Sequence, residues 1–115
     1  MILLNNSNNN LNITYTQLYC NRDAFTVFLH CLLKANPKQE SYSIDGIEIK
    51  RGQLLTSTRE IVMELHLKYS QNSMRRVCAA LTYLKKNGYI HNLRLKSKGK
   101  TAFITIEDYD KWVID

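Results

Sequence analysis

The stretch SQNSMRRVCAALTYLKKNGYI, residues 70–90, decides how the rest of the chain is interpreted. Its apolar residues recur at the 3.6-residue spacing of a helix that buries one face. Ser70 stands before the pattern and can cap the first turn, and Gly88 follows Asn87 where a left-handed C-terminal cap is expected. We therefore predict one amphipathic helix. Its expected buried positions are Met74, Val77, Cys78, Leu81 and Leu84.

The opposite face of this predicted helix is polar and basic. At about 100° per residue, it carries Asn72, Arg75, Arg76, Ala79, Tyr83 and Lys86. Arginine can bind guanine through two hydrogen bonds, and asparagine can bind adenine in the same way. The amino end of the helix offers amides and hydroxyls to phosphates at Ser70, Gln71, Asn72 and Ser73. This face favours contact with DNA, although exposed helices also carry such residues for solubility.

The segment before this helix predicts another helix and a hairpin. Asn36-Pro37 ends the helix, because the residue before a proline avoids the helical conformation. Asp45-Gly46 suits the positive φ values of a type I′ turn between short strands at 43–44 and 47–49. The helix runs from Asp23, and its expected apolar stripe is Phe25, Phe28, Leu29, Leu32 and Leu33.

Three further segments complete the pattern. Residues 54–56 suit a short buried strand, and Ser57 with Glu60 has the capping-box spacing of a second helix. That helix breaks around residues 66–69, where the quoted helix follows. Residues 89–95 and 101–106 are strand-like and are joined by the basic turn 96–100. This order predicts an α+β, mainly α, fold of the winged helix-turn-helix type: a three-helix core plus a small antiparallel sheet whose last hairpin is the wing.

The length of 115 residues suits one domain. We assign residues 1–12, which are rich in asparagine, to a flexible tail, and residues 13–115 to a winged-helix DNA-binding domain. No apolar run approaches the roughly 18 residues of a membrane span, so no membrane partner is expected. Three widely spaced cysteines, with no C-x-x-C pair, suit a reducing cytoplasm.

The formal net charge of +6 is unevenly distributed. Residues 66–106 contain nine lysines and arginines and no acid, a pattern that suits a surface for polyanions and an ordinary solvated basic face about equally. The helix and the wing are basic together. We therefore predict a site for double-stranded DNA made of Ser70, Gln71, Asn72, Ser73, Arg75, Arg76, Tyr83, Lys86, Arg94, Lys96, Lys98 and Lys100.

Several short segments between residues 24 and 112 form a distinctive set: Leu32-Leu33-Lys34-Ala35-Asn36, Lys50-Arg51-Gly52-Gln53, Thr56-Ser57, Ser70 with Met74-Arg75, Leu84-Lys85-Lys86, Gly88-Tyr89-Ile90, Ile104-Thr105-Ile106 and Asp108-Tyr109-Asp110. The set resembles the winged-helix N-terminal domains of phage replication-initiation proteins, the replisome organisers related to DnaD-type primosome proteins. The resemblance implies binding to origin DNA, a role in replisome assembly in a bacterial or phage-infected cell, and partners such as a replisome protein. Those proteins usually continue into a second, partner-binding domain, whereas this sequence ends at Asp115, so a stand-alone regulator is the alternative.

Patterns typical of enzymes are weak in this sequence. The histidines have no H-E-x-x-H spacing and no cysteine partner at zinc-ligand spacing, and the four glycines form no phosphate loop. His30 lies in a helix with an apolar core, so we interpret it as a packed histidine rather than a ligand. We expect no enzymatic activity, no cofactor and no metal.

A second function from another class is a protein-interaction module. Winged helices also self-associate, and the chain has apolar residues near both ends that could form an interface. In that case the basic helix would be incidental, and a small transcriptional regulator remains a further alternative. The candidate interface residues are Met1 to Leu4, Leu11, Ile13 and Trp112 to Ile114.

Overall fold

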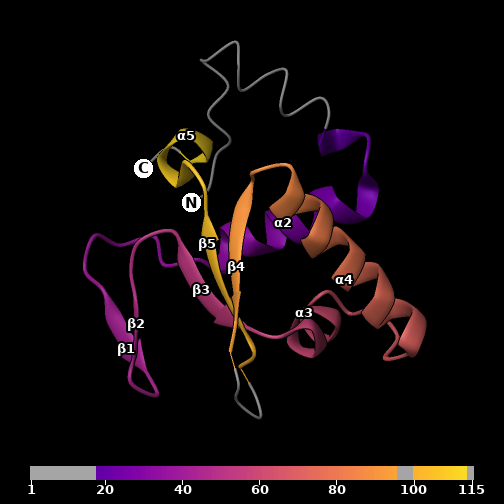
Figure 1. Cartoon of the computed structure of the whole chain (residues 1–115), viewed down its shortest axis with the longest axis horizontal. Coiled ribbons are helices and arrows are strands. Elements are labelled where there is room, and N and C mark those ends of the chain that lie inside the picture. Colours follow the sequence, from indigo (N-terminus) through magenta and orange to yellow (C-terminus); the bar gives the residue numbers. More distant parts are fainter. Residues whose placement is uncertain (1–17, 96–99, 114–115) are drawn as a thin grey trace.

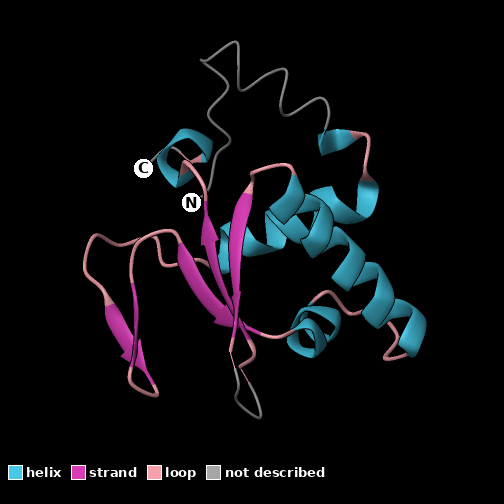
Figure 2. Ribbon diagram, in the orientation of Figure 1, coloured by secondary structure: helices cyan, strands magenta, loops and turns pink. Residues whose placement is uncertain are grey.

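The computed structural model of the chain describes residues 18–95 and 100–113 (Figure 1). Within these residues the fold is α+β, with four helices and two small antiparallel sheets (Figure 2). None of these helices has the length and apolar character needed to span a membrane. The elements are α2 (Arg22–Lys34), β1 (Tyr42–Ile44), β2 (Ile47–Ile49), β3 (Gln53–Thr56), α3 (Thr58–Glu64), α4 (Gln71–Lys86), β4 (Ile90–Arg94), β5 (Ala102–Ile106) and α5 (Tyr109–Trp112).

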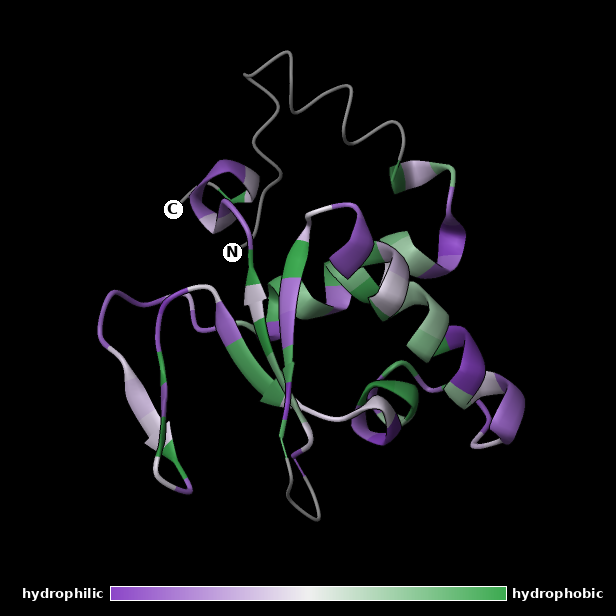
Figure 3. Ribbon diagram, viewed as in Figure 1, coloured by the Kyte–Doolittle hydropathy of each residue, from purple (hydrophilic) through white to green (hydrophobic). Residues whose placement is uncertain are grey.

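The larger sheet has the order β3-β5-β4, with β5 antiparallel to both neighbours. Ile104 pairs with Leu54 on one side and with Asn92 on the other. Alternate residues of β5 are buried, as the two-residue period of a strand requires when one face packs on a core. Residues 54–56 therefore form the predicted third strand, joined to the hairpin of β4 and β5. In Figure 3 much of β3 and β5 has hydrophobic colour, β4 alternates between hydrophobic and hydrophilic colour, and the amino end of α4 is hydrophilic.

The predicted hairpin around Asp45-Gly46 is confirmed. Strands β1 and β2 pair with Ile44 opposite Ile47, and both turn residues have positive φ, as a type I′ turn requires. The hairpin forms its own two-stranded sheet beside β3 and away from α4 (Figure 1).

The predicted buried stripe of α2 is confirmed at Phe28 and Leu32 and is wrong at Leu33. The helix begins at Arg22, after Asn21, whose side chain accepts a hydrogen bond from the Ala24 amide at 3.1 Å. Leu33 is 68% exposed, and Phe25 and Leu29 are only half-buried. Small residues on the neighbouring face allow α2 to pack closely on the rest of the core. The buried residues of α2 are Ala24, Val27, Phe28, His30, Cys31 and Leu32.

The predicted C-terminal cap of α4 is confirmed. Gly88 has a φ of +80°, and its amide donates to the Lys85 carbonyl at 3.2 Å. The Tyr89 amide donates to the Leu84 carbonyl at 2.9 Å, which completes a Schellman motif. The turn sends the chain directly into β4, so α4 and β4 are joined by a short, hydrogen-bonded corner.

The side chain at this corner belongs to an aromatic cluster in the core. The Tyr89 ring lies 5.6 Å from the Phe28 ring of α2 and 6.1 Å from the Trp112 ring of α5. Phe28 and Trp112 are packed edge to face with centroids 4.8 Å apart. The cluster therefore ties α2, α5 and the corner after α4 together.

Asn36 is a buried polar residue that connects three segments of the chain. Its side-chain amide donates to the carbonyls of Ile49 and Glu40, and its Oδ1 accepts from the Lys38 amide. Its backbone exchanges hydrogen bonds with Gly52 and Gln53 at the start of β3. Burying an amide without these partners would cost stability.

Gly52 supports the same junction by allowing a close approach. Its φ is +81°, and a Cβ placed there would lie 2.9 Å from Tyr109 Cβ. Beside it, the Arg51 guanidinium lies 5.1 Å from the Tyr109 ring centroid and donates to Asp110 at 2.8 Å. Arg51 and Gly52 thus fasten α5 to the start of β3.

We predict that Gly52→Ala destabilises the protein more than Gly88→Ala does. Both residues have positive φ, which costs an L-residue about 1–2 kcal/mol, but a Cβ at Gly88 meets nothing within 4 Å. At Gly52 the overlap with Tyr109 adds roughly 1–3 kcal/mol. Urea unfolding of the two variants measures the difference. Equal losses would mean that the Tyr109 contact does not constrain residue 52.

Candidate nucleic-acid interface

The predicted outward face of α4 is exposed at Asn72, Arg75, Arg76, Ala79 and Lys86, and Tyr83 is half-buried. The buried residues of the helix are Ser73, Val77, Ala80, Leu81 and Leu84. The predicted buried set is therefore wrong at two positions, because Cys78 is exposed and Met74 is only half-buried. Ala80 takes the place of Cys78 because a methyl group permits α4 to pack closely on its neighbours.

Ser73, a predicted phosphate contact, is buried at 6% exposure. Its amide donates to the Ser70 hydroxyl at 3.1 Å, so Ser70 is the N-cap, as predicted. The Ser70 hydroxyl also lies 3.3 Å from the Ser73 hydroxyl. Both side chains therefore serve the first turn of the helix, and the exposed polar residues there are Gln71 and Asn72.

The two adjacent arginines of α4 differ in their partners. The Arg76 guanidinium donates to both carboxylate oxygens of Asp23 on α2, at 2.8 and 3.1 Å. This hydrogen bond holds the pKa of Asp23 below its ordinary value of 3.8. Arg75 is exposed, and no ion pair joins it to another of the described residues. Arg75 is therefore the arginine of this helix that is available to a ligand.

A groove lies where α4 meets the larger sheet and the start of α3. Its volume is about 380 Å³. Lys85 of α4 and Arg94 of β4 supply two exposed cations, and none of the described lining residues carries a carboxylate. The lining residues are Thr58, Cys78, Leu81, Thr82, Lys85, Asn92, Arg94, Thr101 and Ala102. Cations and hydroxyls without acids suit an oxyanion such as phosphate.

One residue that lines this groove, Asn92, has an unsatisfied polar atom. Oδ1 of Asn92 is buried and has no hydrogen-bond partner among the described residues. Asn92 faces the core side of the sheet, because it pairs with the buried Ile104.

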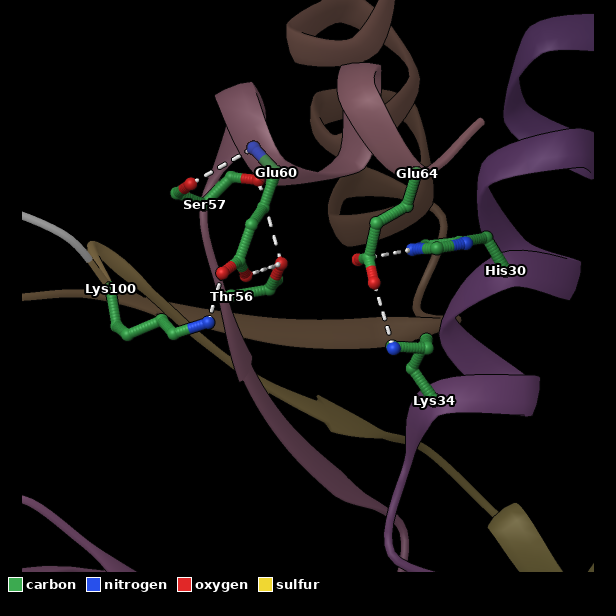
Figure 4. Close-up of polar contacts among 7 residues, drawn as sticks. All are labelled: His30, Lys34, Thr56, Ser57, Glu60, Glu64 and Lys100. Carbon is green, nitrogen blue, oxygen red and sulfur yellow. Dashed lines mark hydrogen bonds and ion pairs between the residues drawn. The ribbon is translucent and has the colours of Figure 1, made fainter. Parts of the chain in front are cut away.

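The predicted wing is only partly described. Lys96 and Lys98 lie outside the described residues, as does the predicted tail at residues 1–12. Arg94 is exposed at the end of β4. Lys100 is the first described residue after residues 96–99, and its ammonium pairs with the Glu60 carboxylate of α3 (Figure 4).

Glu60 has a different role from the one its spacing predicts. Its amide donates to Ser57 at 3.1 Å, which confirms the N-cap. Its carboxylate accepts from the Thr56 hydroxyl at 3.1 Å and holds Lys100, as Figure 4 shows. The carboxylate thus connects α3, the end of β3 and the residue that lies two positions before β5.

The remaining predicted contacts lie at the carboxyl end of α4. Lys86 is exposed in the last turn. Tyr83 is half-buried and packs against the core, so most of its ring is not available for stacking. Sequence reasoning missed Lys85, Thr82 and Thr58, which line the groove. The basic window of residues 66–106 contains Lys85. Only the phase of the helix, however, shows that Lys85 lines the groove.

A second polar group lies one turn further along α3, on the same side of the helix as Glu60 (Figure 4). Glu64 pairs with Lys34 of α2 at 2.7 Å, and this hydrogen bond lowers the pKa of Glu64. His30 is 9% exposed, and its Nε2 lies 3.3 Å from Glu64 Oε1 without the geometry of a hydrogen bond. Burial lowers the pKa of His30, although Glu64 opposes the shift. His30 is therefore packed, as predicted.

The apolar carboxyl-terminal residues are not a free surface. Trp112 and Val113 are buried in the core of their own chain at 4% and 6% exposure. Ile114 and the amino-terminal candidates lie outside the described residues. No cluster of three or more metal-ligating side chains occurs within residues 18–95 and 100–113.

Comparisons of the chain with known proteins found no relative. No protein-family model matches the chain, no curated protein matches it, and no solved structure matches it. The residues and their geometry therefore carry the functional argument.

We predict that His30 makes the stability of the protein sensitive to pH. Because its folded-state pKa is depressed, its contribution is fully present above its ordinary value of 6.5 and is lost as pH falls through the folded value. His30→Gln cannot titrate, so urea unfolding should show a shallower decline below pH 6.5 for this variant. Glu64, whose carboxylate lies beside His30, has its pKa lowered by the hydrogen bond from Lys34, so it titrates at lower pH. Equal slopes in both proteins would contradict the prediction.

Proposed function

We propose that the protein is a winged helix-turn-helix domain that binds double-stranded DNA. The chain order of α2, β3, α3, α4 and the β4–β5 hairpin is the order that such a domain requires. In the sheet of order β3-β5-β4, the β4–β5 hairpin pairs with β3 through β5. We propose that this hairpin is the wing. Helix α4 would then be the recognition helix.

The observation that carries this proposal is the groove between α4 and β4. Lys85 of α4 and Arg94 of β4 both line this groove, and none of its described lining residues carries a carboxylate. The free guanidinium of Arg75 lies on the exposed face of the same helix. One continuous region thus presents groups for base edges and groups for phosphates, which a duplex ligand needs together.

In the proposed complex, the amino-terminal turns of α4 enter the major groove. Arg75 can bind a guanine through two hydrogen bonds, and Asn72 or Gln71 can bind an adenine. Lys85 and Arg94 hold one strand's phosphates between the helix and the wing. Lys100 is tied to Glu60, so we assign it a smaller share of phosphate binding.

We propose a role in DNA replication initiation in a phage or mobile element, with a replisome protein as partner. The support is the resemblance of short segments to replisome organisers. Several of those segments have structural roles here: Asn36, Arg51 and Gly52 hold the junction of α2, β3 and α5. The resemblance therefore supports the proposed fold more directly than it supports the replication role. A small transcriptional regulator is the alternative, because it would use the same DNA-binding surface.

We predict that Arg75→Ala and Arg76→Ala separate recognition from structure. A bidentate arginine–guanine pair provides about 1–3 kcal/mol of discrimination, so Arg75→Ala should lower affinity for the preferred site roughly 5- to 150-fold. Arg76→Ala should leave base preference unchanged and weaken the contact between α2 and α4. Fluorescence anisotropy with a selected duplex and with random duplex measures both effects.

Thermal unfolding is the control, because Arg75→Ala removes no hydrogen bond or ion pair within the described residues. Lys85→Ala should reduce the slope of log K against log salt by about one unit without altering base preference. If neither arginine variant changes DNA binding, α4 is not the recognition helix. A salt slope near zero in the unmodified protein would contradict phosphate binding altogether.

A further inference from the structure

Arg59 and Tyr69 form an exposed pair at the amino end of α4. The guanidinium carbon of Arg59, on α3, lies 5.2 Å from the centroid of the Tyr69 ring. Tyr69 is 59% exposed, and Arg59 is also exposed. Tyr69 directly precedes the N-cap Ser70, so the ring adjoins the helix that we assign to recognition.

The surroundings of this pair suit an anionic ligand. No ion pair links Arg59 to a carboxylate within the described residues. Thr58, the neighbour of Arg59, lines the groove between α4 and β4. Lys68 and Gln71 lie beside Tyr69 in the chain, and both are exposed. The pair is therefore at the border of the proposed DNA-binding region and outside the groove itself.

We propose that Arg59 and Tyr69 stack an unpaired nucleobase, so that the protein prefers duplex DNA that carries a single-stranded segment. This inference rests on the proposed function, because the duplex would be held by α4 and the groove. Aromatic rings and arginine planes stack bases with little regard to sequence. The bases of an intact duplex are stacked on one another and cannot lie on the Tyr69 ring, so only an unpaired base can use this surface.

The guanidinium contributes in two ways to such a site. Its carbon lies over the tyrosine ring, 5.2 Å from the ring centroid, and the cation–π contact keeps the ring in place. Its charge also attracts the phosphate that adjoins the stacked base. A lysine at this position would retain the charge and lose the planar group that can stack on a base.

The test compares a blunt duplex with the same duplex extended by a short thymine overhang, using fluorescence anisotropy. The unmodified protein should bind the extended duplex about 5- to 150-fold more tightly, which is the range measured for one stacked base. Tyr69→Ala should remove this preference and leave affinity for the blunt duplex unchanged. Tyr69→Phe should retain the preference, because stacking needs the ring and not the hydroxyl.

Two matched variants complete the test. Tyr42→Ala removes another exposed tyrosine, on the β1–β2 hairpin, and should have no effect. Arg59→Lys should lower the preference for the overhang while the blunt duplex still binds.

Equal affinity of the unmodified protein for both DNAs would overturn the inference. So would a Tyr69→Phe variant that behaves like Tyr69→Ala, because the hydroxyl would then contact a phosphate. Failure to bind the blunt duplex, with binding to the extended duplex intact and dependent on Tyr69, would contradict the proposed function and support the inference. Binding to neither DNA would overturn both.

Discussion

The corner between α4 and β4 is the constraint on which the proposed interface depends. Gly88 adopts a conformation that L side chains rarely take, and the Tyr89 amide closes the turn on Leu84. Because the corner is short and its tyrosine is held in the aromatic core, α4 and β4 have one relative orientation. In that orientation Lys85 of α4 and Arg94 of β4 line the same groove. A longer or looser connection would leave two basic segments without a common surface.

Local signals in the sequence predict the elements well, because each depends on a few neighbouring residues. Ser57 and Ser70 cap the helices that follow them, and Asp45-Gly46 forms its turn. The helix phases are predicted less well, since small residues such as Ala80 give no hydrophobic signal and yet pack most closely. Cys78 looks apolar and is exposed.

Partners that are distant in the sequence could not be predicted. Asp23 and Arg76 are 53 positions apart, and nothing local distinguishes Arg76 from Arg75. Likewise, the acid-free window around α4 contains Lys100, but the carboxylate that holds it is Glu60, which lies before that window. The charge of a segment therefore predicts where a polyanion could bind, and the fold decides which cations are available. Here Arg75, Lys85 and Arg94 are among the available ones.

Cross-linking through native cysteines tests the central claim most directly. Cys78 is exposed and lines the groove, Cys20 is exposed before α2, and burial raises the pKa of Cys31 to about 12, which makes it unreactive. A photoreactive group would be attached to Cys78 in a Cys20→Ser protein, or to Cys20 in a Cys78→Ser protein. Our account predicts efficient cross-linking to duplex DNA from Cys78 and little from Cys20. Equal cross-linking from both positions, or cross-linking from Cys20 alone, would contradict it.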